Sequence, residues 1–387
     1  MGSTKIKNIG IMVSGDVKNP LLKADALLIK DGKIAKWGNN VEIPDSEAEK
    51  IIDAGGMALT PGLIDSHCHV VLMDYTPRQN QIGFLASELH GGVTTVISAG
   101  EVHLPGRPND PAGIKALAIL AAKSFSKFRP GGMKVIGGGV ILEPGLVEKD
   151  FEEMAKEGVR VVGEIGLGKI KQPDDAAPMV KWAKKYGMTV MMHTGGTSIP
   201  GSSTVTADQV IATDPDIVAH INGGPTAIPL EEAKKLIDKT ELTLEFVHCG
   251  NPKMAVEVAK IINEKGLYHR VIIGNDAPSG TGVVPLGILR VMNLISSLGD
   301  IPPEMAVCMA TGNTAKVHKL NRGFIKEGFE ADLILMDAPM GSVGDDLLSA
   351  IKAGDNPAVA MVLVDGEVVV TKSRNTPPPK RKANIIK

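Results

Sequence analysis

Short apolar runs separated by turn residues mark both ends of this chain, and a different pattern fills its middle. The runs are typical of β-strands, and Asp31-Gly32 is a strong hairpin signal between two of them. The strands expected here are 6–11, 26–29, 33–37, 51–53, 331–336, 361–364 and 367–370. Because the same pattern of short strands and turns appears at both ends, we expect one small composite β-sandwich built from the N- and C-terminal segments.

In the middle, short apolar strands alternate with amphipathic helices, such as those expected over 148–157 and 174–186. The expected strands end near residues 69, 98, 141, 165, 193, 220, 248 and 275. Eight strand–helix units predict an α/β fold, a (β/α)8 TIM barrel of about 250 residues. A doubly wound open sheet is the alternative, and it is disfavoured because no Gly-x-Gly-x-x-Gly follows the first strand.

These patterns divide the chain into four parts. The N-terminal part of the sandwich covers 1–58, the barrel covers 59–322, and the C-terminal part of the sandwich covers 323–374. The remaining residues, 375–387, are polar and rich in proline. Since proline fixes φ and lacks a backbone donor, we expect an exposed, extended tail there.

Composition narrows the classes of partner. The 387 residues carry 42 Lys plus Arg against 44 Asp plus Glu, so no basic field attracts nucleic acid or anionic lipid. Three cysteines without a C-x-x-C pair argue against a disulfide framework. No segment approaches the run of about 20 apolar residues that a membrane helix needs. We expect a cytoplasmic protein that acts on a small molecule, with neither nucleic acid nor membrane as a partner.

Candidate chemistry begins at Asp65-Ser66-His67-Cys68-His69, directly after an apolar run. In an extended strand, side chains i and i+2 leave the same face, so His67 and His69 form a two-nitrogen chelate. Neutral imidazole is the commonest protein ligand for a catalytic transition metal. A lone His-x-His also occurs by chance, so the other strand ends decide the interpretation.

Glu164, His193, His220 and Asp276 stand at the ends of later expected strands. In such a barrel these ends meet at one rim, where active sites lie. Each residue alone has an ordinary explanation: a buried histidine, a rim carboxylate paired with Lys169, or a helix cap. Together they predict a binuclear metal site, because a carboxylate can bridge two cations that share a hydroxide. Asp276 would then serve as general base and afterwards as general acid.

The chain resembles the amidohydrolase superfamily from its N-terminal β-strands to about Asp365. The residues that carry the resemblance are Pro61-Gly62-Leu63-Ile64-Asp65-x-His67-x-His69, Gly91-Gly92-Val93-Thr94-Thr95, His193, His220, Asp276 and Gly323-x-Ile325-x-x-Gly328-x-x-Ala331-Asp332-Leu333. The resemblance implies a metal-dependent barrel that hydrolyses C–N bonds in cyclic amides. It implies that His67 and His69 hold the more buried metal, that His193 and His220 hold the other, and that Asp276 is both ligand and proton shuttle. Members commonly form dimers or tetramers, so we expect a homo-oligomer.

Two further features refine the resemblance. Many binuclear members bridge their metals with a carboxylated lysine, whereas Glu164 occupies that position here. The loops 193–203, 220–226 and 274–282 are similar to those of the enamidases within this superfamily. That similarity implies two divalent ions, Zn²⁺ with Fe²⁺ possible at one position.

It also implies a reaction of nicotinate degradation, in which a metal-bridging hydroxide opens 6-oxo-1,4,5,6-tetrahydronicotinate to give 2-formylglutarate and ammonia. The alternative is another cyclic amidase of the dihydroorotase or hydantoinase type, or an isoaspartyl-dipeptidase-like enzyme. A non-catalytic scaffold is disfavoured because all six candidate ligands are kept.

Candidate substrate contacts come from the same rim. An anionic ring favours a planar cation, and Arg78 and Arg107 follow the first and second barrel strands. His103 could donate a hydrogen bond to a substrate oxygen, and Thr194 and Asn222 adjoin candidate ligands. Each of these side chains also fits a simple role in a loop or at the surface.

Overall fold

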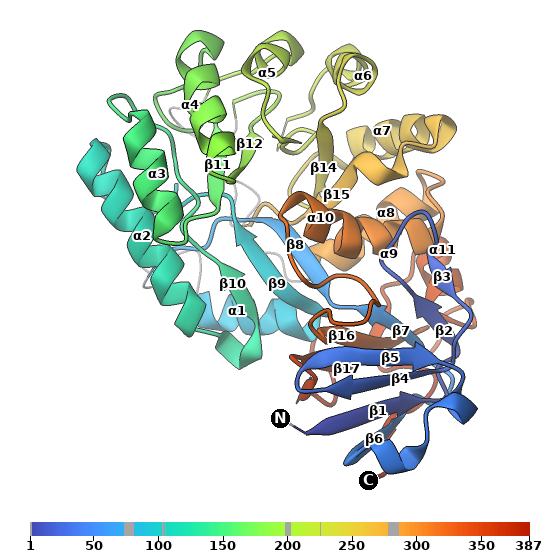
Figure 1. Ribbon diagram of the computed structural model, residues 1–387. Coiled ribbons are helices and arrows are strands. Elements are labelled where there is room, and N and C mark those ends of the chain that lie inside the picture. Colours follow the sequence, from blue (N-terminus) through green and yellow to red (C-terminus); the bar gives the residue numbers. More distant parts are fainter. Residues whose placement is uncertain are drawn as a thin grey trace.

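The computed structural model describes residues 2–72, 81–102, 104, 106–197, 203–224, 226–277 and 286–387. Within these ranges, eight parallel strands surround a common axis (Figure 1). They are β8 (Leu63–Cys68), β9 (Val93–Ser98), β10 (Lys134–Ile136), β11 (Val161–Ile165), β12 (Thr189–Met192), β13 (Ile217–Val218), β14 (Thr243–Val247) and β15 (Val271–Gly274).

Two junctions close these strands into a barrel. β8–β10 form one sheet and β11–β15 another, and parallel bridges join Val140 to Val162 and Cys68 to Ala277. The backbone N–H of His69 donates to the Ala277 carbonyl at 2.8 Å across the second junction. The expected (β/α)8 barrel is therefore confirmed. One strand end differs, since β10 stops at Ile136 and its pairing resumes at Val140 as an isolated bridge.

Helices cover the outside of the barrel. They are α1 (Gln81–His90), α2 (Pro111–Lys127), α3 (Glu148–Lys156), α4 (Pro173–Lys185), α5 (Ala207–Thr213), α6 (Leu230–Lys239), α7 (Pro252–Lys265) and α8 (Gly287–Ser297). α7 shows why the sequence forms such a helix. The Asn251 side chain accepts from the Met254 N–H, Pro252 occupies the first turn, and Gly266 ends the helix at φ 64°.

After α8 the chain crosses the end of the barrel at which the strands begin. α9 (Pro303–Cys308), a π-helical turn (Met309–Asn313) and α10 (Thr314–Val317) follow one another, and α11 (Leu347–Ala353) packs against α8. Ala315 of α10 joins the buried apolar cluster inside the barrel. In the described part of the chain, no helix is long and apolar enough to cross a membrane.

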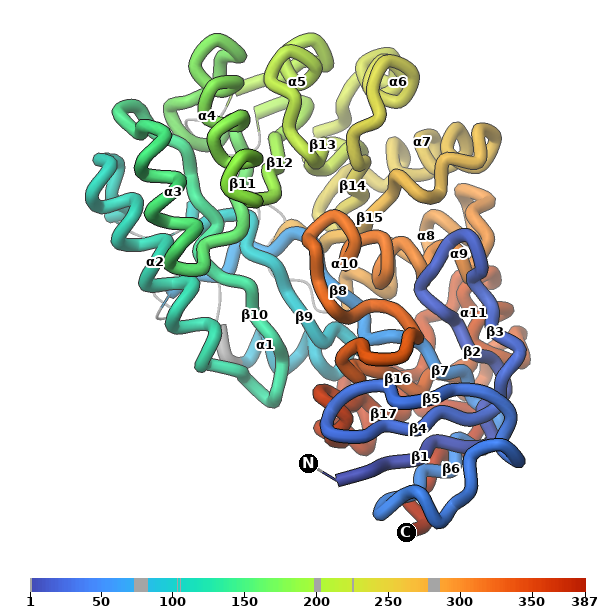
Figure 2. Tube along the Cα trace, viewed as in Figure 1, coloured from blue at the N-terminus to red at the C-terminus, as the bar shows by residue number. Residues whose placement is uncertain are grey.

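Two β-sheets lie beside the barrel, and both take strands from the two chain ends (Figures 1 and 2). One has the order β19-β6-β1-β4-β5 and the other β18-β17-β16-β7-β2-β3. The N-terminal strands are β1 (Ser3–Lys7), β2 (Ile11–Val13), β3 (Leu21–Leu22), β4 (Ala26–Lys30), β5 (Lys33–Gly38), β6 (Lys50–Asp53) and β7 (Ala58–Pro61). The C-terminal strands are β16 (Leu333–Asp337), β17 (Ala358–Val364), β18 (Glu367–Val370) and β19 (Asn384–Ile385).

The single strand expected over 6–11 is wrong. The chain leaves the first sheet after Lys7, turns at Asn8 with φ 56°, and enters the second sheet at Ile11. Asn tolerates this left-handed backbone better than most residues, which is why the turn can occur here. β7 then leads directly into β8, so the second sheet is tied to the first strand of the barrel.

Residues 375–387 run along their own chain. β19 pairs with β6, and Arg381 forms an ion pair with the fully buried Asp337 of β16 at 2.7 Å. Both termini consequently lie at the sandwich end of the molecule (Figure 2). The four-part division drawn from the sequence stays a prediction, and β7 lies across its boundary at residue 58.

Candidate active site

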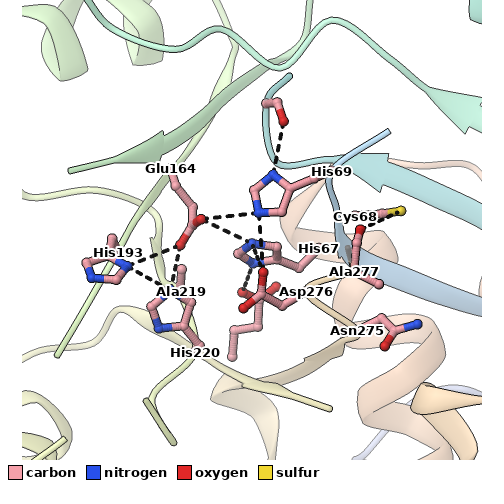
Figure 3. Close-up of polar contacts among 12 residues, drawn as sticks. His67, Cys68, His69, Glu164, His193, Ala219, His220, Asn275, Asp276 and Ala277 are labelled. Carbon is pink, nitrogen blue, oxygen red and sulfur yellow. Dashed lines mark hydrogen bonds and ion pairs between the residues drawn. The ribbon is translucent and has the colours of Figure 1, made fainter. Parts of the chain in front are cut away.

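Six side chains converge where the barrel strands end (Figure 3). All six residues are buried, and Asp276 is the most exposed at 7%. They come from β8, β11, β12, β13 and β15 and the residues that directly follow these strands. They are His67, His69, Glu164, His193, His220 and Asp276.

The first group comprises His67, His69, Glu164 and Asp276, and we call it the first position. Oε2 of Glu164 lies 3.4 Å from Nε2 of His67 and 3.4 Å from Nε2 of His69. Oδ1 of Asp276 lies 3.5 Å and 3.2 Å from the same two nitrogens. Four ligand-type atoms therefore face one small volume.

The second group comprises Glu164, His193 and His220, and we call it the second position. Oε1 of Glu164 lies 2.6 Å from Nε2 of His220 and 3.7 Å from Nδ1 of His193. Those two nitrogens are 3.1 Å apart. The two oxygens of Glu164 thus face different histidine pairs.

Two of these residues have unusual backbone conformations. Asp276 has φ 59° and His220 has φ 36°, both in the left-handed region that non-glycine residues seldom adopt. The Asp276 N–H donates to the His67 carbonyl at 2.7 Å, which holds the strained residue against β8. Strain of this kind concentrates at functional sites because the surrounding structure must maintain it.

Hydrogen bonds on the outer side orient the imidazoles. Nδ1 of His67 lies 2.7 Å from Oε2 of Glu245, and Nδ1 of His69 lies 3.0 Å from the Gly100 carbonyl. Nε2 of His193 contacts the Gly196 carbonyl at 3.0 Å. In these three histidines the outer nitrogen faces an acceptor, so the inner nitrogen can present its lone pair to the centre.

Sequence reasoning missed Glu245. Its signal was present, because an acid stands in the otherwise apolar run Leu244-Glu245-Phe246-Val247 of a barrel strand. A carboxylate at such a place must have a partner inside the barrel. The partner lies 178 positions away in the sequence, which local patterns cannot reveal.

The electrostatics favour positive charge at the centre. Burial raises the pKa of Glu164, but His67 and His220 outweigh this effect and hold it well below the usual value. Burial lowers the pKa of His69, but hydrogen bonds to Asp276 and Glu164 raise it to about 9. The carboxylates therefore stabilise cationic charge, which protons on the imidazoles or metal ions can supply.

The sequence of this chain matches a known protein family. Residues 58–369 match the model of the Amidohydrolase family. The chain belongs to the amidohydrolase family. It is therefore a hydrolase of C–N bonds from a metal-dependent family.

Relatives extend the assignment over the whole chain of this amidohydrolase. It is 61% identical over 386 residues to the enamidase of Eubacterium barkeri, and the match covers 100% of both chains. It also matches a crystal structure of enamidase with a TM-score of 0.96 over 99% of this chain and 100% of that one. A 5-methylthioadenosine/S-adenosylhomocysteine deaminase of Pyrococcus furiosus is 26% identical, with 94% of each chain covered.

The donor set of the amidohydrolase fits divalent metal ions. Imidazole nitrogens and carboxylate oxygens suit zinc and iron, and the atoms of each position lie within 4.8 Å of one another. Nε2 of His67 is buried and, within the described residues, has no hydrogen-bond partner. A metal ion would satisfy this nitrogen.

The structure gives three of the candidate substrate residues partners within the chain. Thr194 Oγ1 donates to the Ala219 carbonyl at 2.8 Å. Asn222 uses both ends of its amide, donating to the Val247 carbonyl at 2.9 Å and accepting from its N–H at 3.0 Å. Arg107 pairs with Glu143 at 2.8 Å. A substrate role for these residues stays a prediction, and Arg78 and His103 lie outside the described residues.

Proposed function

We propose that this amidohydrolase is a binuclear enamidase that opens a small cyclic amide. The observation that carries the proposal is the place of Glu164, whose two oxygens face two separate histidine pairs. Full-length identity of 61% to an enamidase supports the choice of substrate. The two lines of support are independent, because one concerns the chemistry and the other the substrate.

In this proposal the first and second positions would each hold one divalent cation, and Glu164 would supply a carboxylate oxygen to each. Zn²⁺, with Fe²⁺ at one position, suits ligands of this kind. When bound, such a pair polarises the amide carbonyl and lowers the pKa of water to about 7. The protein's own contribution is to fix these ligands in a buried, preorganised arrangement.

Asp276 is the proposed proton carrier. Its Oδ1 lies beside Nε2 of His69 and of His67, and its side chain is 10% exposed, against 3% for Glu164. It can therefore touch both the ligand centre and a substrate above it. Its carboxylate takes the proton of the attacking water and delivers it to the leaving ring nitrogen, so its protonation state is restored.

The proposed substrate is 6-oxo-1,4,5,6-tetrahydronicotinate, as the resemblance to the enamidases implies. Water first breaks the lactam C–N bond and gives a carboxylate and an enamine. A second water then replaces the amino group of the enamine, which yields 2-formylglutarate and ammonia. Two waters are consumed and one ammonia is released in each turnover.

Ammonia release tests this proposal directly. Protein purified with zinc, and separately with iron, should release ammonia from this substrate. Ring opening of dihydroorotate and of a hydantoin releases no ammonia, so it is followed by formation of the carbamoyl product, and it should be far slower. Ammonia release equal to that of a no-enzyme control, with both positions loaded, would reject the substrate. Faster turnover of dihydroorotate or hydantoin would favour the alternative cyclic amidases.

We further propose that the protein acts in the cytoplasm as a homodimer or homotetramer. The three cysteines, Cys68, Cys249 and Cys308, are buried and form no disulfide with one another, which suits a reducing compartment. Light scattering coupled to gel filtration tests the assembly, and a monomeric mass at micromolar concentration would contradict it.

A further inference from the structure

Glu245 is a charged residue inside the barrel wall. It stands in the middle of β14, and its side chain is 0% exposed. Its neighbours Leu244 and Phe246 belong to the buried cluster between the strands and the helices. Because successive side chains of a strand point to opposite faces, Glu245 points into the barrel.

Both carboxylate oxygens of Glu245 contact the strand that carries the first ligands. Oε2 lies 2.7 Å from Nδ1 of His67, and Oε1 accepts a hydrogen bond from the Ser66 hydroxyl. A buried carboxylate is costly unless it is paired and hydrogen-bonded. Glu245 meets this requirement through two consecutive residues of β8.

The other outer contacts of the imidazoles are different. The acceptors facing His69 and His193 are the neutral carbonyls of Gly100 and Gly196. Nδ1 of His220 is buried and has no hydrogen-bond partner among the described residues. Among these residues, a carboxylate therefore lies on the outer side of His67, and none lies on the outer side of His193 or His220.

We propose that Glu245 is a positioning residue that fixes His67 as an Nε2 ligand and makes the first position the tighter of the two metal sites. The inference rests on the proposed binuclear function. By accepting a hydrogen bond from Nδ1–H of His67, Glu245 excludes the tautomer in which Nε2 carries the proton and cannot bind a metal. Its negative charge also raises the basicity of the imidazole.

The direct charge contacts point the same way. Among the described residues, the histidines of the first position contact Glu164, Asp276 and Glu245, whereas those of the second contact Glu164. A divalent cation at the first position is therefore surrounded by more negative charge. The two positions should differ in affinity although both present two imidazoles.

Wild-type protein provides the first test. Zinc-loaded protein is equilibrated with increasing concentrations of a chelator, and the metal remaining per chain is measured. Two steps are expected, and crystals taken after the first step should show anomalous scattering at His67 and His69 alone. Loss of the first-position metal before the other would overturn the proposal, and so would equal affinity.

The Glu245→Gln variant provides the second test, since it keeps the size and removes the charge. Zinc affinity at the first position should fall about 10- to 100-fold, which is typical for loss of an outer partner. The second position should change much less. Asp337→Asn is the matched control, because it neutralises another fully buried carboxylate, in β16 of the sandwich.

The Ser66→Ala variant separates the two contacts of Glu245. It removes the hydroxyl contact, keeps the contact to His67, and should retain the zinc affinity of the wild type. Unchanged affinity in Glu245→Gln, or an equal loss in Asp337→Asn, would reduce Glu245 to a structural residue. Failure of the wild type to bind two metals would instead refute the binuclear proposal, so the two failures are distinguishable.

Discussion

Two clusters of ionisable groups lie at opposite ends of the barrel, one buried and the other partly buried, and their negative charge is neutralised in different ways. At the ends of the strands, four histidines and two carboxylates face one another (Figure 3). At the start of β10, Glu330, Asp332 and Asp365 surround the ammonium of Lys134, at 2.6, 2.8 and 2.6 Å. Both carboxylate sets are compact enough to hold a metal ion.

The difference is the cation that the chain itself supplies. Lys134 stands where an ion would otherwise bind, and Arg129 and Arg322 pair with Asp365 and Glu330 at 2.8 Å each. Within the described residues, no lysine or arginine forms an ion pair with Glu164 or Asp276. A cluster that contains its own ammonium joins the barrel to the sandwich, whereas a cluster without one is suited to external cations.

The largest expected effect is on turnover at the strand ends. Asp276→Ala removes the proposed proton carrier and should lower kcat by roughly 10²–10⁴-fold. Most of the metal should remain, because Glu164 and the four histidines are unchanged. Steady-state ammonia release and metal content measured on the same preparation check this expectation, and full activity would contradict the shuttle role.

The opposite cluster should respond in stability. Lys134→Met removes the ammonium that lies 2.8 Å from the buried Asp332 and leaves this carboxylate with Arg322 at 3.8 Å, which should lower the free energy of unfolding by up to about 3–5 kcal/mol. Turnover per folded molecule at 25 °C should stay near that of the wild type. Urea unfolding with parallel activity measurements tests this contrast, and loss of kcat without loss of stability would show that the comparison is wrong.

The histidines of the two ends should also respond differently to pH. His318, which follows α10 beneath the barrel, is 6% exposed, and neither of its ring nitrogens has a hydrogen-bond partner among the described residues. Burial, together with the nearby Lys319, lowers its pKa to about 3, whereas the carboxylates raise the pKa of His69 to about 9. The pKa of a buried histidine is therefore lowered at His318 by burial itself and raised at His69 by the neighbouring carboxylates.

This shift in His318 gives the smallest of the three effects. Below about pH 6.5 the unfolded chain binds a proton that the folded chain does not, so the free energy of unfolding falls as the pH drops towards 3. The slope from this residue is about 1.4 kcal/mol per pH unit at most. Urea unfolding at pH 7, 6 and 5 measures it, and His318→Gln should flatten the dependence. An equal slope in that variant would assign it to other groups.

The same two clusters show how far the sequence can be interpreted. The strand ends and the six candidate ligands follow from local patterns, because a strand that ends at a barrel rim leaves its mark within a few residues. The pairing of Lys134 with Asp332 spans 198 positions, and that of His67 with Glu245 spans 178. Such contacts depend on which strands become neighbours, which no local pattern encodes.

Backbone geometry was hidden for a similar reason. The positive φ of His220 has no sequence signature, since it results from the contacts that surround the residue. The break after Lys7 was missed because isoleucines recur on both sides of the turn, at 6, 9 and 11, although the chain passes there from one sheet to the other. The fold was therefore predictable from periodicity, and the outer contacts of the site were not.

An anomalous-scattering map of zinc-loaded crystals tests the central claim most directly. The account predicts two peaks per chain, one at His67 and His69 and the other at His193 and His220, with one oxygen of Glu164 directed at each. No peak should appear among Glu330, Asp332 and Asp365, where Lys134 supplies the charge. A single peak, or none at these histidines, would contradict the account.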